Sequence, residues 1–170
     1  ICIETHLKNI DNELADLFLK CGIKLVYVGI ESADEEVRKD AKRWSDENDV
    51  QMEKINYLEK IGIKIKTMYI IGFPEENKEK FLKTVDYAIK VNSSYAQFSV
   101  FTPYPGTPVY QEYQKKIIAK KYEDFNQWKL VFKHKNFDEK SIRYLVDFAF
   151  KKYYLRFSWI KKFLSNKIFS

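Results

Sequence analysis

The sequence is poor in cysteine. Only Cys2 and Cys21 occur among its 170 residues, which excludes a framework of disulfides and a metal site built from clustered cysteines. Free thiols are often buried, and Cys21 closes an apolar helix face, so we expect both cysteines to pack in the core. A chain without disulfides also favours a cytoplasmic location.

Long apolar runs are missing as well. No segment reaches the 18 or so consecutive apolar residues that a membrane-spanning helix needs. The chain opens with Ile1-Cys2-Ile3-Glu4, without an initiator methionine and without the pattern of a signal peptide. Because this opening already resembles a strand, we expect the chain to be a fragment whose partner is the N-terminal half of the same protein.

Acidic residues are absent from the last 20 positions. Residues 151–170 contain six basic side chains and no Asp or Glu, so they alone account for the net charge of +6. The remaining 150 residues are neutral, and no nucleic-acid partner is expected from such an uneven distribution.

The same tail has a helical apolar pattern. Phe157, Ile160, Leu164 and Ile168 follow helical spacing with lysines between them. One interpretation is a basic amphipathic helix, residues 157–170, that lies on an anionic membrane surface and places the protein at the periphery of the inner membrane. The other is a terminal helix that packs on the domain with its lysines in solvent.

Three strand-like apolar runs each end in a short polar or Gly/Pro turn. They are KLVYVGIES at 24–32, TMYIIGFPEEN at 67–77 and QFSVFTPYPGTP at 97–108. Helical patterns between them indicate repeated βα units. Because the carboxyl ends of parallel strands meet at one edge, these turns predict a single binding site built from successive loops.

The whole pattern alternates strands and helices. We predict strands at 1–5, 25–30, 63–71 and 96–101, helices at 11–21, 34–42, 49–61, 78–91 and 138–156, an exposed helix after Pro108, and a strand-like segment at 129–132. The fold class is therefore α/β: a partial (βα) TIM-like barrel with a helical C-terminal extension. We place the barrel domain at residues 1–110 and the extension at residues 111–170.

The first turn carries Glu31 and Ser32 directly after a buried strand. Such a pair suits ribose hydroxyls or a charged small molecule, whereas the alternative is helix capping by Ser32 or Asp34. In the second turn, Gly72 allows a close backbone approach, and Asn77 is positioned to cap the next helix. The third turn, at 102–108, contains three prolines, so it is either a preorganised binding loop or a stiff structural connection.

Taken together, these residues resemble the C-terminal half of a radical S-adenosylmethionine enzyme of the class associated with a cobalamin-binding domain. The resemblance rests, in order, on Glu4-Thr5-His6, on segments 11–22, 28–32, 69–77 and 96–108, and on Tyr153-Tyr154-Leu155-Arg156. Each motif is weak alone. Their order and spacing along the whole chain carry the resemblance.

The resemblance implies an S-adenosylmethionine pocket on the rim of a partial barrel. Glu31 and Ser32 would contact the ribose and methionine portion, and Glu4 and His6 would face the cavity near the substrate. The residues implied to surround the adenine are Ile71, Gly72, Phe73, Pro74, Phe101, Thr102, Pro103 and Tyr104.

Two departures from the family pattern qualify the resemblance. The chain has Glu75-Glu76-Asn77 where the family usually has Gly-Glu-Thr, although Asn77 can still cap the helix. It also contains neither the C-x-x-x-C-x-x-C loop nor the G-G-E strand. The ligands of the [4Fe–4S] cluster, and any cobalamin-binding domain, are therefore expected outside this chain, which should be inactive alone.

The expected function of the parent protein is reductive cleavage of S-adenosylmethionine at the cluster. The cleavage would support radical chemistry or methyl transfer on an unidentified small-molecule or lipid-like substrate. The alternative is a non-catalytic binding or scaffold module, which the missing cysteines favour. We interpret His134, between Lys133 and Lys135, as a solvated loop residue.

Overall fold

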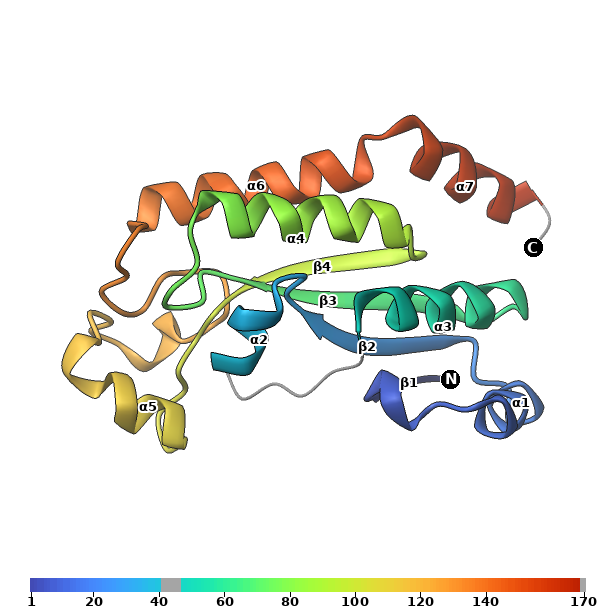
Figure 1. Cartoon of the computed structure of the whole chain (residues 1–170), viewed down its shortest axis with the longest axis horizontal. Helices are drawn as coiled ribbons and strands as arrows, with labels where there is room; N and C mark the ends of the chain where they lie inside the picture. The colour runs from blue at the N-terminus through green and yellow to red at the C-terminus, as the bar shows by residue number, and fades with distance from the viewer. Residues whose placement is uncertain (41–46, 169–170) are drawn as a thin grey trace.

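The computed structural model describes residues 1–40 and 47–168, with side chains for residues 1–39 and 47–164 (Figure 1). Its centre is one parallel sheet of four strands in the order β1-β2-β3-β4. The strands are β1 (Cys2–Thr5), β2 (Leu25–Glu31), β3 (Lys64–Ile71) and β4 (Tyr95–Val100). The predicted α/β class and its four parallel strands are confirmed.

Within the described residues, seven α-helices and three 3-10 turns connect and cover these strands. The helices are α1 (Asn12–Lys20), α2 (Glu35–Asp40), α3 (Asn48–Lys60), α4 (Lys78–Val91), α5 (Pro108–Tyr113), α6 (Glu139–Tyr154) and α7 (Phe157–Ile168). The 3-10 turns are η1 (Leu7–Asn9), η2 (Gln114–Lys116) and η3 (Tyr122–Asp124). Positions 41 and 42 of the predicted helix 34–42, and the end of the predicted tail helix, lie outside the described residues.

The two faces of the sheet differ. Alternate residues of β2, β3 and β4, such as Val28, Tyr69 and Phe98, are wholly buried on the face covered by α3, α4 and α6 (Figure 1). The residues between them, such as Tyr27, Lys66 and Gln97, are only half-buried. Sequential strand order with right-handed crossovers puts the helices on one face, so the other is the inner face of an open barrel.

The turns at the helix ends follow the predicted signals. Asp11 caps α1 by accepting from the backbone N–H of Leu14 at 2.8 Å, and Asn77 caps α4 through Lys80 at 2.9 Å. Asp138 and Ser141 form a reciprocal capping box at the start of α6. The local sequence therefore defines where these helices begin.

The C-terminal helices are fastened to the amino end of β4. Tyr153 donates its hydroxyl hydrogen to the carbonyl of Ser93 at 2.6 Å, and Arg156 donates to the side chain of Asn92 at 2.6 Å. In α7, the indole of Trp159 donates to the carbonyl of Ser94 at 3.0 Å. These contacts give the Tyr-Tyr-Leu-Arg motif a structural role: it joins α6 and α7 to the α4–β4 turn.

Two predictions about the core are wrong. Cys2 and Cys21 are both exposed, because Cys2 lies on the edge strand β1 and Cys21 follows the last buried residue of α1, Phe18. The strand-like segment 129–132 forms an isolated antiparallel bridge, between Phe132 and Ile117, and its apolar residues are buried without a ladder.

Candidate functional site

A cavity of about 370 Å³ lies at the carboxyl ends of the strands, on the inner face of the sheet. The structure brings six predicted residues together around it: Glu4, Glu31, Phe73, Phe101, Thr102 and Tyr104. The other six are not among its lining residues: His6, Ser32, Ile71, Gly72, Pro74 and Pro103. Residues at the ends of all four strands therefore contribute to one hollow.

Glu31 is held in an unusual backbone conformation at the end of β2. Its φ is +69°, in the left-handed region that a non-glycine residue rarely adopts, and the pairing with β3 shifts register here. Its carboxylate folds back over Gly29, where an added Cβ would lie 2.9 Å from the Glu31 Oε1 atom. Gly29 thus leaves room for a carboxylate directed along the cavity wall.

Ser32 and Asp34 make capping contacts. Ser32 is fully buried, with its hydroxyl 3.1 Å from the Thr84 hydroxyl, and it accepts from the backbone N–H of Asp34. Asp34 caps α2 by accepting from the N–H of Val37 at 3.2 Å. The predicted alternative of helix capping is therefore realised at this turn.

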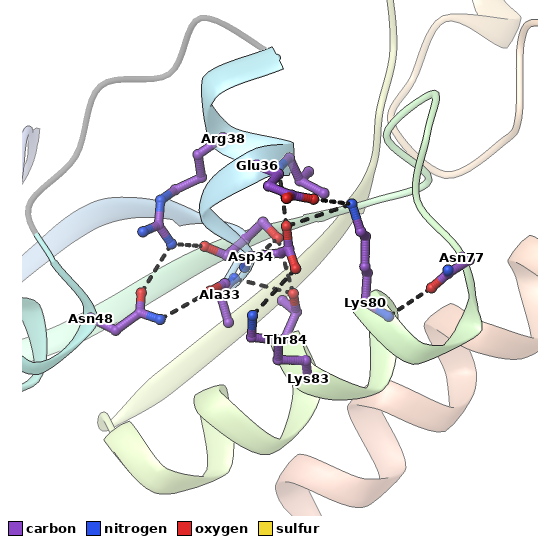
Figure 2. Close-up of polar contacts among 11 residues, drawn as sticks. Ala33, Asp34, Glu36, Arg38, Asn48, Asn77, Lys80, Lys83 and Thr84 are labelled. Carbon is purple, nitrogen blue, oxygen red and sulfur yellow. Dashed lines mark hydrogen bonds and ion pairs between the residues drawn. The ribbon is translucent and has the colours of Figure 1, made fainter.

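Two lysines of α4 converge on Asp34 (Figure 2). Lys83 lies 3.3 Å and Lys80 3.7 Å from its two carboxylate oxygens, and Lys80 also pairs with Glu36. Burial raises the pKa of Asp34, but the hydrogen bonds from Val37 and Lys83 outweigh it and hold the pKa below its ordinary value. Asp34 is therefore ionised and anchors the turn to α4.

A second set of bonds fastens the same turn to α3 (Figure 2). Arg38 donates to the carbonyl of Ser32 and, at 2.9 Å, to the side chain of Asn48. Asn48 donates in turn to the carbonyl of Ala33 at 2.9 Å. Three helices therefore hold the backbone directly after Glu31, which keeps that carboxylate in place at the cavity.

In the second turn, the side chain of Glu76 bonds back to the backbone of Gly72. Gly72 has a φ of +79°, and its N–H donates to the Glu76 Oε2 atom at 2.6 Å. Glu76 is completely buried, and its Oε1 atom has no hydrogen-bond partner among the described residues. Burial raises the pKa of Glu76 to about 8, so the carboxyl is protonated at neutral pH. Sequence reasoning missed this residue.

The prediction that His134 is solvated is wrong. The residue is buried, and its Nε2 atom lies 2.7 Å from the carbonyl oxygen of Phe73. Its Nδ1 atom accepts from the N–H groups of Asn136 and Phe137, so Nε2 carries the hydrogen and donates. Burial lowers the pKa of His134, which keeps the ring neutral. Its partner lies 61 residues away in the sequence, which hides the contact from local pattern analysis.

The third turn combines a stiff frame with an aromatic cavity wall. Thr107 caps α5 through the N–H of Tyr110 and donates to the carbonyl of Tyr104 at 2.7 Å. Phe101 leaves the end of β4 and lies 5.2 Å from the ring of Phe73. The backbone of this loop is therefore a stiff structural turn, as one of the two interpretations predicted. The ring of Phe101, directly before the loop, faces the cavity.

Two polar residues of β4 that line the cavity were not predicted. Gln97 and Ser99 project from β4 toward the cavity, where the Gln97 amide donates to the Ser99 hydroxyl at 3.0 Å. They share a face with Phe101 because side chains alternate along a strand. That two-residue period in QFSVF would have identified both.

The remaining predicted residues do not line the cavity. His6 caps η1, where its Nδ1 atom accepts from the N–H of Lys8 at 3.4 Å. Ile71 belongs to the buried face of β3. Among residues 1–40 and 47–168, no group of three or more His, Cys, Asp or Glu side chains could hold a metal ion. The described side chains therefore do not provide the set of ligands that a [4Fe–4S] cluster needs.

A sequential parallel sheet with helices on one face and a cavity at its strand ends defines an open α/β barrel. The sequence model described as "Radical SAM superfamily" matches residues 1–88. The chain belongs to the radical SAM superfamily, a family of enzymes, and the predicted resemblance is confirmed.

Two curated relatives and one solved structure illustrate this membership. An uncharacterized methyltransferase of Pyrococcus horikoshii is 28% identical over 155 residues, covering 89% of this chain and 33% of the relative. Bacteriochlorophyllide d C-12(1)-methyltransferase of Chlorobaculum tepidum is 25% identical over 123 residues, covering 72% and 27%. The chain thus spans about a third or less of these relatives.

The solved structure is the radical S-adenosylmethionine methyltransferase TsrM from Kitasatospora setae, with cobalamin and a [4Fe–4S] cluster bound. It superposes with a TM-score of 0.59 at 22% identity, over 67% of this chain and 23% of the other. This similarity supports the fold. Within the described residues no helix is both long and apolar enough to span a membrane.

Proposed function

We propose that this chain supplies the ribose and adenine side of the S-adenosylmethionine site in a radical SAM enzyme. The observation that carries the proposal is the cavity lined by Glu31, Phe73, Phe101 and Tyr104, which come from three different strand ends. Aromatic rings suit a planar base, and a carboxylate can accept hydrogen bonds from ribose hydroxyls.

The chain's own residues have distinct tasks in this proposal. Glu31 is held over Gly29 and accepts from the ribose, while the Phe73 and Phe101 rings contact the adenine and exclude water. Glu76 and His134 hold the backbone of the adenine-side turn from its two sides. When bound, S-adenosylmethionine supplies the methyl group or the radical, as the cofactor's own chemistry.

The other cofactors belong to regions of the protein beyond these residues. We propose that a [4Fe–4S] cluster is bound by ligands outside this chain, and that a cobalamin-binding domain accompanies it. Support comes from superfamily membership and from the similarity to the cobalamin-bound methyltransferase. We propose radical chemistry or methyl transfer as the reaction; the two relatives above, which are methyltransferases by name, support methyl transfer. We also propose that the chain divides into a barrel domain, residues 1–110, and an extension, residues 111–170.

The site is tested by S-adenosylmethionine binding to the full-length, cluster-reconstituted protein. Phe101→Leu and Tyr104→Leu keep apolar volume but remove the ring face, and we expect each to weaken binding about tenfold in equilibrium dialysis. Tyr122→Leu is the matched control, because Tyr122 is 75% exposed and lies in η3 away from the cavity. Equal affinities for the site variants and the control would overturn the proposal.

A surface role for α7 is a second proposal. One side of this helix packs on the domain through Trp159, whereas Phe157, at 81%, and Leu164, at 53%, are exposed. Lys161 of α7 is exposed, and the last 20 residues hold six basic and no acidic side chains, so this helix suits an anionic membrane surface.

Vesicle co-sedimentation tests this second proposal. The double variant Phe157→Ser and Leu164→Ser should lose binding to phosphatidylcholine vesicles that contain phosphatidylglycerol, while Tyr144→Ser on α6 should retain it. Unchanged pelleting of the double variant would reject the membrane role.

A further inference from the structure

A second hollow lies on the inner face of the sheet, toward the amino ends of the strands. Its volume is about 410 Å³. It is lined by Leu25, Tyr27, Lys66, Tyr95, Ala96, Gln97, Trp128, Phe150 and Tyr154. Gln97 also lines the cavity at the strand ends, so the two hollows adjoin along β4.

The walls of this hollow are aromatic and fixed. Phe150 and Tyr154 of α6 stack at 6.2 Å with an angle of 11° between their rings, and the Tyr154 hydroxyl bonds to both the N–H and the carbonyl of Ala96. Trp128 stands 6.5 Å from Phe150 and is 53% exposed, although it is a large aromatic residue. A rigid aromatic surface that stays open to solvent suits a flat ligand.

Lys66 gives the hollow a positive charge. It lies in register with Tyr27 on one neighbouring strand and with Tyr95 on the other, and its ammonium group stands 4.7 Å from the centre of the Tyr27 ring. Among the described residues it has no carboxylate partner within ion-pair distance. A half-buried cation beside aromatic rings is poised to pair with an anion.

The two hollows carry different charges, and Glu4 of the strand-end cavity lies in register with Tyr27, one strand further from Lys66. Glu4 and Glu31 line the cavity at the strand ends, whereas Lys66 is the charged residue of the aromatic hollow. A ligand that spans the shared Gln97 therefore meets opposite charges at its two ends. An anionic group is repelled from the strand-end cavity and attracted to Lys66.

We propose that the aromatic hollow binds a planar aromatic carboxylate, with its ring between Trp128 and Tyr27 and its carboxylate on Lys66. This proposal rests on the proposed function in one respect: if the strand-end cavity binds S-adenosylmethionine, the ligand of the aromatic hollow is the substrate held beside it. Binding of the ligand in the aromatic hollow does not itself depend on S-adenosylmethionine.

The test measures binding of 2-naphthoate and of its uncharged methyl ester to the full-length protein by isothermal titration calorimetry, without S-adenosylmethionine. Lys66→Met keeps the length of the side chain and should weaken 2-naphthoate binding about tenfold, leaving the ester unaffected. Lys66→Arg should restore it. Lys64→Met is the matched control, because Lys64 lies two residues away on the same face of β3, is exposed and does not line the hollow.

Trp128→Ser should weaken the acid and the ester alike, because it removes a wall and leaves the charge. Absence of saturable 2-naphthoate binding, or equal loss in the Lys66→Met and Lys64→Met variants, overturns the inference. The two proposals fail separately: 2-naphthoate binding does not involve Phe101 or Tyr104, and S-adenosylmethionine binding does not involve Lys66.

Discussion

The two ends of the sheet are stabilised by different means. At the carboxyl end, the turns depend on a left-handed glutamate, a buried protonated carboxyl and a buried neutral imidazole, at Glu31, Glu76 and His134. At the amino end, neutral hydroxyl groups of Tyr153 and Tyr154 bond to the backbone around β4. The left-handed Glu31 and the buried ionisable side chains of Glu76 and His134 therefore lie at the cavity end of the sheet, as such groups do at functional sites.

The largest difference in stability between the two ends of the sheet is expected when a glycine with a positive φ is replaced by alanine. Gly72→Ala places a Cβ in the left-handed region and 3.0 Å from the Ile142 side chain, so we expect a loss of about 2–4 kcal/mol in the free energy of unfolding. Gly22→Ala, at the other end, also has a positive φ but an open surrounding, and should cost about 1 kcal/mol. Urea denaturation of both variants checks this; equal losses would contradict the comparison.

The amino end is tested through the hydroxyl of Tyr153. Tyr153→Phe leaves the buried carbonyl of Ser93 without its 2.6 Å donor, so a loss of about 1–3 kcal/mol in the free energy of unfolding is expected. Tyr144→Phe on the exposed side of the same helix should change nothing measurable. A similar stability for the two variants would show that the hydroxyl does not fasten α6.

The effect most specific to the carboxyl end is a pH dependence. The pKa of Glu76 is raised from 4.5 to about 8 in the folded protein. Between these values the folded state keeps a proton that the unfolded state releases, so this contribution to stability falls as pH rises, by up to about 1.4 kcal/mol per pH unit.

Glu76→Gln replaces the neutral carboxyl with an amide that cannot titrate. Urea unfolding of the wild type and the variant between pH 5 and pH 8 gives the difference that isolates this group, because His134 and Asp34 remain in both proteins. We expect the wild type to lose stability relative to the variant as pH rises. A difference that stays constant with pH would show that Glu76 is ionised in the folded state.

The sheet could be predicted from the sequence because its signals are local. Apolar runs closed by Gly22, Gly62 and Gly72, and caps such as Asp11 and Asn77, define strands and helices within a few residues. The rim position of Glu31, Phe73 and Phe101 followed from the rule that carboxyl ends of parallel strands converge.

The buried side chains that hold the turns of the site in place could not be predicted in the same way. Glu76 and His134 look solvated because their sequence neighbours are charged, and their burial depends on α6 and the preceding turn folding back over residues 72–76. Cys21 was misplaced because the buried positions of α1 end at Phe18, although the neighbouring Leu19 is apolar. Long-range packing, which leaves no periodic trace, decided the burial of Glu76 and His134.

The hydroxyl of Tyr154 on Ala96 has a consequence for self-association. Together with the carbonyl of Gln127, which accepts from the N–H of Val100 at 2.7 Å, it occupies the outer edge of β4. A further strand, or a strand of a second copy, therefore finds its backbone partners on the β4 edge already taken, so this edge cannot template strand addition.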